Sequence, residues 1–220
     1  MFSTTQFSVA AENSPTVYLV DDDADFSLWL SEALASIQVH IEAFRTPSAF
    51  FGRFDRNRMG CILLDVRLPE MSGLEVQKRL VCMGVLTPIV LITAYGDVSM
   101  AVEALKSGAV DFIQKPCSVQ ALLDRLQRAI DIGIDRHRAS SQASYITARI
   151  ESLSPREAET MNLLLDGKTT KEIASLLNIG LTTVDFHRKN VLDKMNVENV
   201  VTLTRLMGRY RELTALVGTE

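Results

Sequence analysis

The chain has 220 residues, of which 47% are hydrophobic and 23% are charged, and its formal net charge is −4. This composition is typical of folded globular proteins and excludes an intrinsically disordered chain. The length suffices for one large domain or two ordinary ones. No apolar stretch approaches the roughly 20 residues that a membrane-spanning helix needs, so no membrane partner is expected.

The cysteines and the first residues indicate the compartment. Cys61, Cys82 and Cys117 lie in or beside apolar segments without the spacing of a metal site. We therefore expect reduced thiols in a cytoplasmic protein. Residues 1–15 have neither the basic start nor the long apolar stretch of a signal peptide, and we predict that they form a disordered tail.

The charge is distributed unevenly along the chain. Residues 1–148 carry 13 Lys and Arg against 17 Asp and Glu, whereas residues 149–220 carry ten of each. A local basic stripe matters more for DNA binding than the overall charge. Such a stripe lies within residues 186–211, where Arg188, Lys189, Lys194, Arg205, Arg209 and Arg211 outnumber Asp193 and Glu198.

Residues 16–130 alternate between strand-like apolar runs and amphipathic helical stretches. Five such units with short connections predict an α/β fold with a doubly wound, five-stranded parallel sheet and right-handed crossovers. Strands are expected at 16–20, 39–44, 60–64, 87–92 and 110–114, and helices at 24–37, 47–54, 74–83, 97–107 and from 118 onward.

Polar residues follow four of these predicted strands. Asp21 and Asp22 follow the first, Asp65 the third, Thr93 the fourth and Lys115 the fifth. The carboxyl ends of parallel strands converge on one crevice, so these side chains should meet there. Gathered carboxylates need a hard cation, for which Mg²⁺ is suited, and a lysine with a threonine suits a phosphoryl group. The pattern predicts a site for phosphorylating an aspartate.

The fifth predicted helix has no clear end. Its apolar spacing continues through Ile134 despite Gly133, and the polar run 138–144 is linker-like. We therefore place the domain boundary in that run.

Beyond the polar run the pattern is helical only. A helix begins at Ser154 and Pro155, another at Thr170 and, after a short turn at 178–181, a third near Thr182. A helix, a tight turn and a helix with basic residues predict an all-α helix-turn-helix domain that binds DNA.

Two sets of motifs carry a resemblance to a known family. Over residues 16–130 the chain reads LVDDD, LLDVRLPEMSGLE, ITAYGD and VEALKSGAVDFIQKP, and over residues 150–212 it reads LSPREAE and LLLDGKTTKEIASLLNIGLTTVDFHRKNVLDKM. The chain thus resembles two-component response regulators of the FixJ/NarL class. The resemblance implies a flavodoxin-like receiver at 16–131, a linker at 132–149 that partly extends the last receiver helix, and a LuxR-type helix-turn-helix domain at 150–220.

The resemblance assigns roles at the predicted site. Asp65 would be the phosphoacceptor. Asp22 and Asp65 would bind Mg²⁺ (or Mn²⁺) directly and Asp21 largely through water, and the backbone carbonyl of Arg67 would complete the protein ligands. We interpret Asp23 as a solvated loop residue or a helix cap.

The resemblance also implies a switch. Lys115 would pair with the phosphoryl oxygens, and Thr93 would donate its hydroxyl to one of them. Phe112 would then rotate into the space that Thr93 leaves, although a static core aromatic is the alternative reading. The surface made by helix 97–107, strand 110–114 and the helix from 118 would change and pair with a second subunit.

Two positions near the predicted site carry bulky residues in place of small polar ones. Arg67 and Tyr95 stand two positions beyond Asp65 and Thr93, where they would flank the path of an attacking water. We therefore expect the phosphoryl group to last longer than in a regulator that has small polar residues at these two positions.

In the helix from Thr182, apolar spacing predicts that Val184, Val191, Leu192 and Met195 face the core. The resemblance places Asp185, Phe186 and Lys189 toward base edges in the major groove. Thr182, Thr183 and Arg188 are expected to touch phosphates and so fix the register.

The sequence favours a response regulator that receives a phosphoryl group from a sensor histidine kinase, forms a homodimer and binds double-stranded DNA, with RNA polymerase a possible partner. It would not be an enzyme beyond promoting its own phosphorylation and dephosphorylation. An aspartate-based phosphatase needs an acid two residues beyond the nucleophile, where this chain has Arg67. A protein-interaction adaptor is disfavoured by the DNA-binding half. The main alternative is a DNA-binding regulator whose receiver acts independently of phosphorylation.

Overall fold

The computed structural model describes residues 14–35 and 39–217. Most of the expected disordered tail therefore lies outside the described residues. The chain divides into two compact units between His137 and Arg138. In the part of the chain that is described, no helix is long and apolar enough to cross a membrane.

The first unit contains a five-stranded parallel sheet, as predicted. The strand order is β2-β1-β3-β4-β5, and β1 pairs with both β2 and β3. Every residue of β1, β3 and β4 is buried, which matches the apolar runs of strands that are covered on both faces. The strands are β1 (Thr16–Val20), β2 (His40–Phe44), β3 (Gly60–Asp65), β4 (Ile89–Thr93) and β5 (Asp111–Gln114).

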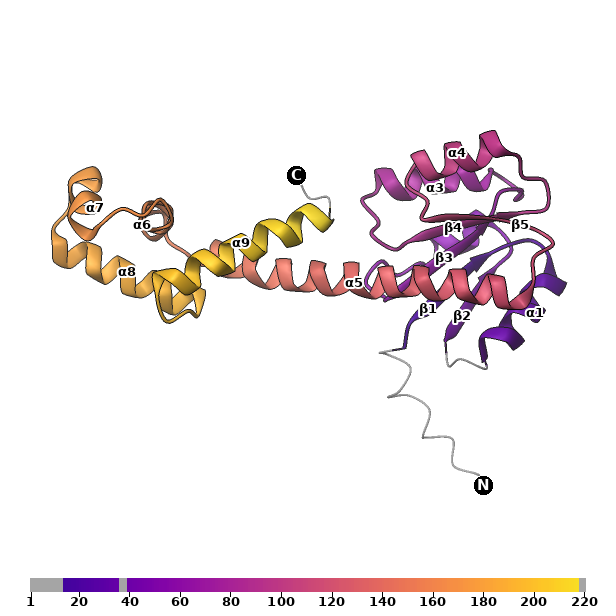
Figure 1. Cartoon of the computed structure of the whole chain (residues 1–220), viewed down its shortest axis with the longest axis horizontal. Helices are drawn as coiled ribbons and strands as arrows, with labels where there is room; N and C mark the ends of the chain where they lie inside the picture. Colours follow the sequence, from indigo (N-terminus) through magenta and orange to yellow (C-terminus); the bar gives the residue numbers. More distant parts are fainter. Residues whose placement is uncertain (1–13, 36–38, 218–220) are drawn as a thin grey trace, which may run out of the picture. The chain divides into compact units, whose positions relative to one another are not determined.

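Helices cover both faces of this sheet (Figure 1). α1 (Ala24–Ala35) and α5 (Val119–Glu151) pack on one face, where Leu30 and Leu126 are fully buried. α2 (Pro47–Phe51), α3 (Gly73–Cys82) and α4 (Val98–Lys106) pack on the other. Because α1 to α4 each connect two parallel strands, the carboxyl ends of the strands lie along a common edge.

The helix α5 continues through the polar run 138–144 that the sequence suggested to be a linker. Ala139, Ala143 and Ile146 are buried at helical spacing, which gives this segment an apolar stripe within the second unit. The Thr147 and Tyr210 hydroxyls lie 3.0 Å apart, and Arg209 Nη2 donates to Gln142 Oε1 at 2.9 Å. Side chains of this part of α5 therefore contact α9.

Gly133 does not interrupt α5 either. A Cβ at this position would lie 2.0 Å from the carbonyl oxygen of Gly60, which begins β3. The missing side chain thus lets α5 approach the sheet backbone closely, and Gly133 serves packing at this point.

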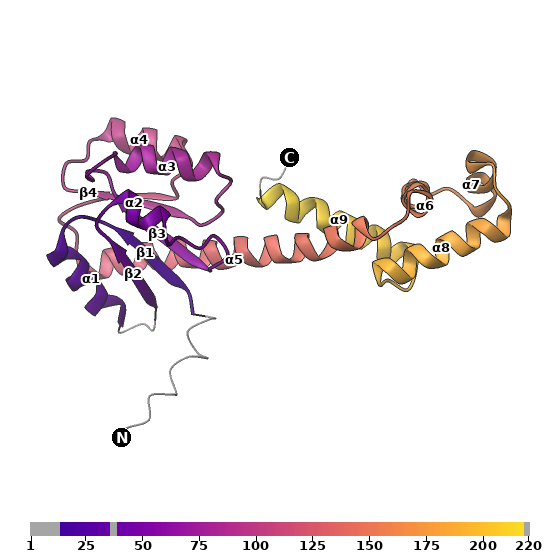
Figure 2. The same cartoon turned by 180° about the vertical axis from the view of Figure 1, so that it is seen from behind.

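The helices α6 to α9 of the second unit make it all-helical, as predicted. They are α6 (Pro155–Leu165), α7 (Thr170–Leu177), α8 (Leu181–Met195) and α9 (Val200–Val217). Figure 2 shows α7 and α8 meeting at a short turn, where Asn178 takes the left-handed conformation with φ 53°. Capping boxes at Ser154 and Thr169 start α6 and α7. Leu164, Ile173 and Val184 pack together and fix the helix-turn-helix.

An ion pair joins α6 to α8. The Glu157 carboxylate is buried, lies 2.6 Å from Lys194 Nζ and accepts a hydrogen bond from Ser154 N at 2.8 Å. Lys194 and these Ser154 hydrogen bonds hold the pKa of Glu157 at about 2, below its ordinary value of 4.5. The ionised Glu157 carboxylate therefore stabilises the folded unit fully above pH 4.5, and this contribution is lost as the pH falls toward 2.

We expect Glu157→Gln to lower the free energy of unfolding of the second unit by about 1–3 kcal/mol at pH 7, and by less at pH 3. Thermal unfolding of the full chain at both pH values measures this difference. Glu159→Gln is the matched control, because the Arg156–Glu159 pair is exposed and should contribute at most about 0.5 kcal/mol. If Glu157→Gln lowers the free energy of unfolding equally at both pH values, the ionised Glu157 carboxylate is not the source of this stabilisation.

Candidate functional site

Three of the predicted strand-end side chains meet at the carboxyl edge of the sheet. The Lys115 ammonium lies 2.6 Å from Asp21 Oδ2 and 3.1 Å from Asp65 Oδ2. Thr93 ends β4 and is buried, and its backbone carbonyl accepts from Lys115 N at 2.8 Å. The end of β3 and the loops after β1 and β5 thus bring two carboxylates and one ammonium together, with the Thr93 hydroxyl at the end of β4.

Burial and charge act against each other in this cluster. Asp21 is fully buried, and burial raises the pKa of its carboxyl although Lys115 and the Asp23 amide act to lower it. Burial alone lowers the pKa of Lys115, but Asp21 and Asp65 together raise it above its ordinary value. Lys115 therefore keeps its positive charge and balances part of the negative charge of the two carboxylates.

Asp65 is held by both of its oxygens. Oδ1 accepts from Arg67 N at 2.9 Å, while Oδ2 faces Lys115. This arrangement fixes the carboxylate at the mouth of the crevice. Asp22 is exposed beside Asp21. Asp23 caps α1 by accepting from the amides of Asp25 and Phe26 at 3.0 and 3.1 Å, which confirms its interpretation as a helix cap.

An aromatic ring of α1 supports Lys115. Lys115 Nζ lies 3.9 Å from the ring centroid of Phe26, whose ring is tilted against that of Trp29 at 5.5 Å. A cation over an aromatic face is attracted by the ring quadrupole. Nothing in the sequence pattern indicates this role, because Phe26 reads as one apolar residue of an amphipathic helix.

The ring of Phe112 lies against the loop after β4. A Cβ at Gly96 would come within 2.8 Å of Phe112 Cε1 and 3.2 Å of the Thr93 methyl carbon. The ring edge and Thr93 are thus close neighbours, and Gly96 leaves room for the ring.

Arg67 and Tyr95 stack on each other at the rim of the site. The Arg67 guanidinium lies 3.9 Å from the Tyr95 ring centroid, and Tyr95 N donates to Thr93 Oγ1 at 3.3 Å. The two bulky residues therefore form one pair near Asp65 and Thr93, which their separate places in the sequence did not indicate.

We expect Arg67→Ala and Tyr95→Ala each to speed the loss of the phosphoryl group several-fold, because either change removes the same stack and opens a path for water. The rate is measured from the decay of phosphorylated chain after the phosphodonor is removed. Lys78→Ala, on the exposed surface, should leave the rate unchanged. An unchanged rate of phosphoryl loss in both variants would contradict this prediction.

The helix α8 presents the predicted DNA contacts to solvent. Val184, Val191 and Met195 are fully buried, as predicted, and Leu192 is half-buried. The remaining predicted residues lie on the other faces: Thr182, Thr183, Asp185, Phe186 and Lys189 are exposed and Arg188 is half-buried.

A segment of α5 holds the carboxyl end of α8. Arg149 Nη1 donates to the Met195 carbonyl at 2.8 Å, and the guanidinium also contacts the Tyr145 hydroxyl and lies 4.2 Å from the Tyr145 ring centroid. Lys194 Nζ donates to the Ser152 carbonyl at 3.0 Å. Arg149 thus satisfies a terminal helix carbonyl that would otherwise need water.

The first unit is therefore built as a receiver, with two acids and a lysine at the carboxyl edge of its sheet, and the second as a helix-turn-helix domain. Residues 17–127 match the response regulator receiver domain family, and residues 151–207 match the bacterial regulatory proteins of the luxR family. The chain belongs to the two-component response regulators that carry a LuxR-type DNA-binding domain and regulate transcription.

Relatives align over nearly the whole chain. The response regulator protein TmoT of Ectopseudomonas mendocina is 37% identical over 201 residues, which covers 91% of each chain. The transcriptional regulatory protein FixJ of Bradyrhizobium diazoefficiens is 36% identical and covers 88% of this chain and 94% of its own. The solved structure of the response regulator StyR superposes with a TM-score of 0.82 at 36% identity, covering 90% of this chain and 100% of that one.

Mg²⁺ is the metal that the receiver family implies. The described residues contain no group of three or more His, Cys, Asp or Glu side chains placed to hold a metal ion. The two acids Asp21 and Asp65 face the Lys115 ammonium. Their carboxylate oxygens are nevertheless the hard donors that Mg²⁺ prefers. The donor chemistry of the site therefore fits the ion.

Proposed function

We propose that Asp65 accepts a phosphoryl group from a cognate sensor histidine kinase and that this modification controls DNA binding. The observation that carries the proposal is the Lys115 ammonium, which lies within 3.1 Å of Asp65 Oδ2 and within 2.6 Å of Asp21 Oδ2. A cation held between two acids at the mouth of a crevice neutralises the charge that a phosphoryl group brings.

An Asp65 oxygen attacks the phosphorus, and the bond to the kinase histidine breaks to leave an aspartyl phosphate. Such a transfer depends on positioning and on charge neutralisation rather than on covalent machinery. Lys115 supplies a positive charge and Thr93 a hydroxyl donor to the phosphoryl oxygens. The hydrogen bond from Arg67 N keeps the Asp65 carboxylate oriented.

Asp21, Asp22, Asp65 and the backbone carbonyl of Arg67 would hold Mg²⁺ (or Mn²⁺) at this site. The ion supplies positive charge next to the transferred group. Asp22 is exposed and therefore accessible to a hydrated ion.

Phosphorylation draws Thr93 toward Asp65 and frees Phe112 to follow, because a phosphoryl group adds roughly 1.5 to 2 negative charges and strong acceptors. The surface that responds includes α4, where Val98 is 81% exposed, Val102 44% and Leu105 48%. A group of exposed apolar residues at helical spacing suits a protein partner. We assign this surface, with β5 and the start of α5, to homodimer formation.

The dimer places two copies of α8 on paired DNA half-sites. Asp185, Phe186 and Lys189 face base edges, where Lys can donate to guanine, Asp can accept from cytosine and Phe can meet a thymine methyl. Thr182, Thr183 and Arg188 contact phosphates near the start of the helix. RNA polymerase is a further candidate partner of the DNA-bound dimer.

The decisive experiment compares wild type with Asp65→Asn, with and without acetyl phosphate and Mg²⁺. We expect wild type to dimerise and to bind DNA more tightly with the phosphodonor, whereas Asp65→Asn should respond in neither assay. Analytical ultracentrifugation and DNA titration measure the two responses. If both proteins bind DNA equally and neither responds, the receiver acts independently of phosphorylation and the proposal fails.

A further inference from the structure

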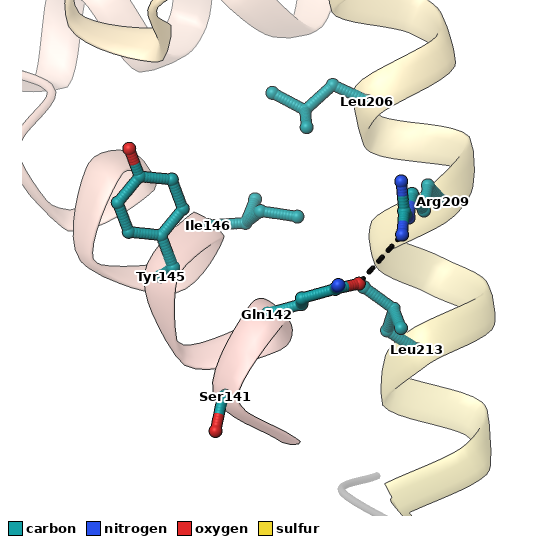
Figure 3. A pocket seen from close by; sticks show the side chains of 7 residues that line it. All are labelled: Ser141, Gln142, Tyr145, Ile146, Leu206, Arg209 and Leu213. Carbon is teal, nitrogen blue, oxygen red and sulfur yellow. Dashed lines mark hydrogen bonds between the residues drawn. The ribbon is translucent and has the colours of Figure 1, made fainter. Parts of the chain in front are cut away.

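A pocket of about 320 Å³ lies within the second unit, between the last part of α5 and α9 (Figure 3). Its volume is within the range of sites that bind small molecules. None of its lining residues belongs to the phosphorylation site or to the DNA-facing side of α8. The known activity of the chain therefore leaves this pocket without a role.

The wall of the pocket is apolar. Ile146 of α5 is 4% exposed and Leu213 of α9 is 8% exposed, and Leu206 adds a half-buried side chain. Tyr145 also lines the pocket, and Arg149 contacts both its hydroxyl and its ring. In Figure 3 the side chains of Ile146, Leu206 and Leu213 lie in the space between the two helices. The pocket thus offers a surface that suits an aromatic or aliphatic body.

The Arg209 guanidinium adds a positive charge to the lining of the pocket. Arg209 Nη2 donates to the neutral Gln142 Oε1 at 2.9 Å, as Figure 3 shows. Among the described residues no carboxylate forms an ion pair with Arg209. A guanidinium has five N–H donors, so most of its donors remain for a ligand. A planar guanidinium matches a carboxylate or sulfonate through paired hydrogen bonds.

We propose that this pocket binds a small organic anion, with its apolar body against Ile146, Leu206 and Leu213 and its anionic group on Arg209. A DNA phosphate could meet the guanidinium but would leave the apolar wall uncovered. A neutral apolar molecule would cover the wall but gain no charge-assisted hydrogen bond from Arg209, which is exposed beside the pocket. The combination of wall and charge selects a molecule that carries both features.

A bound anion bridges α5 and α9. Because Arg149 of the same α5 segment donates to the Met195 carbonyl, the bridged segment also holds the carboxyl end of α8. A ligand that binds only the folded unit raises its stability by mass action. The second unit is therefore expected to melt at a higher temperature when the pocket is filled.

The test uses the full chain and two fluorescent probes with the same body. 8-Anilinonaphthalene-1-sulfonate carries an anionic group, and N-phenyl-1-naphthylamine lacks it. We expect saturable binding of the sulfonate at one site per chain, at least about tenfold tighter than binding of the neutral probe, since charge-assisted hydrogen bonds are among the strong ones. Equal affinities for the two probes would overturn the proposal.

Two variants and a matched control locate the site. Arg209→Gln should weaken sulfonate binding about tenfold and leave the neutral probe unaffected. Arg205→Gln removes the same charge one helical turn away, outside the pocket lining, and should change neither. Leu206→Phe fills the pocket and should abolish binding of both probes while the circular dichroism spectrum stays that of wild type.

Three outcomes count against the pocket. If Arg209→Gln and Arg205→Gln weaken sulfonate binding equally, the sulfonate responds to the general surface charge and not to the pocket. If Leu206→Phe binds the sulfonate as wild type does, the probe sits elsewhere. If affinity rises on dilution in step with dissociation of a dimer, a second copy of the chain covers the pocket in place of an anion.

Discussion

Gly133→Ala is expected to destabilise the first unit by about 3 kcal/mol, although a glycine in a helix is ordinarily a favourable site for alanine. The added Cβ would lie 2.0 Å from the Gly60 carbonyl oxygen and 3.0 Å from its carbonyl carbon. These are backbone atoms, so no side chain can rotate away. Either α5 must lift from the sheet or β3 must shift, and both movements disturb the packing of fully buried residues such as Leu126.

Gly208 in α9 is the matched control. A Cβ there meets no atom within 4 Å, so Gly208→Ala should stabilise the second unit by roughly 0.5–1 kcal/mol through helix propensity. The single tryptophan, Trp29, reports urea unfolding of the first unit alone. If Gly133→Ala leaves or raises the urea midpoint seen by Trp29 fluorescence, α5 does not approach the sheet as described.

Lys115→Gln is expected to slow phosphorylation of Asp65 by about 10² to 10³, the usual cost of removing one preorganised charge partner from a reacting group. The ammonium is within 3.1 Å of one Asp65 oxygen and within 2.6 Å of one Asp21 oxygen, and glutamine cannot supply its charge. Phosphodonor-dependent dimerisation and DNA binding should be lost with it. The initial rate with acetyl phosphate and Mg²⁺ measures the effect.

The same variant separates charge neutralisation from metal binding. The Lys115 ammonium shares the two carboxylates that would hold Mg²⁺, so its removal should tighten binding of the ion while phosphorylation slows. Lys78→Gln, which breaks an exposed pair with Glu103, should alter neither quantity. Weaker Mg²⁺ binding in Lys115→Gln would contradict this arrangement of charges.

The strand ends could be read from the sequence because they follow from periodicity and topology. Buried parallel strands appear as short apolar runs, and the residue after each run must lie at the carboxyl edge. This logic predicts that Asp21, Asp65 and Lys115 lie together, and the Lys115 ammonium contacts both carboxylates. In α8 the same kind of spacing identified Val184, Val191 and Met195 as core residues, which the structure confirms.

Features that depend on packing between distant segments could not be read in this way. The run 138–144 is polar in composition, yet Ala139 and Ala143 are buried and Gln142 accepts a hydrogen bond from Arg209 of α9. Phe26 faces Lys115 only because α1 and the loop after β5 meet. Arg67 and Tyr95 are each bulky in the sequence, but their stacking depends on the contact between two loops and not on spacing within either motif.

The hydrogen bond from Arg149 to the Met195 carbonyl limits where this chain can be joined to another in a chimera. The match to the luxR family begins at residue 151, so a chimera fused there would carry α8 without its Arg149 contact. A junction at residue 138 keeps Arg149, Tyr145 and the buried alanines with the helices they pack on. A chimera that exchanges the receivers of two such regulators should therefore be joined in the middle of α5. The helical phase should be preserved across the junction.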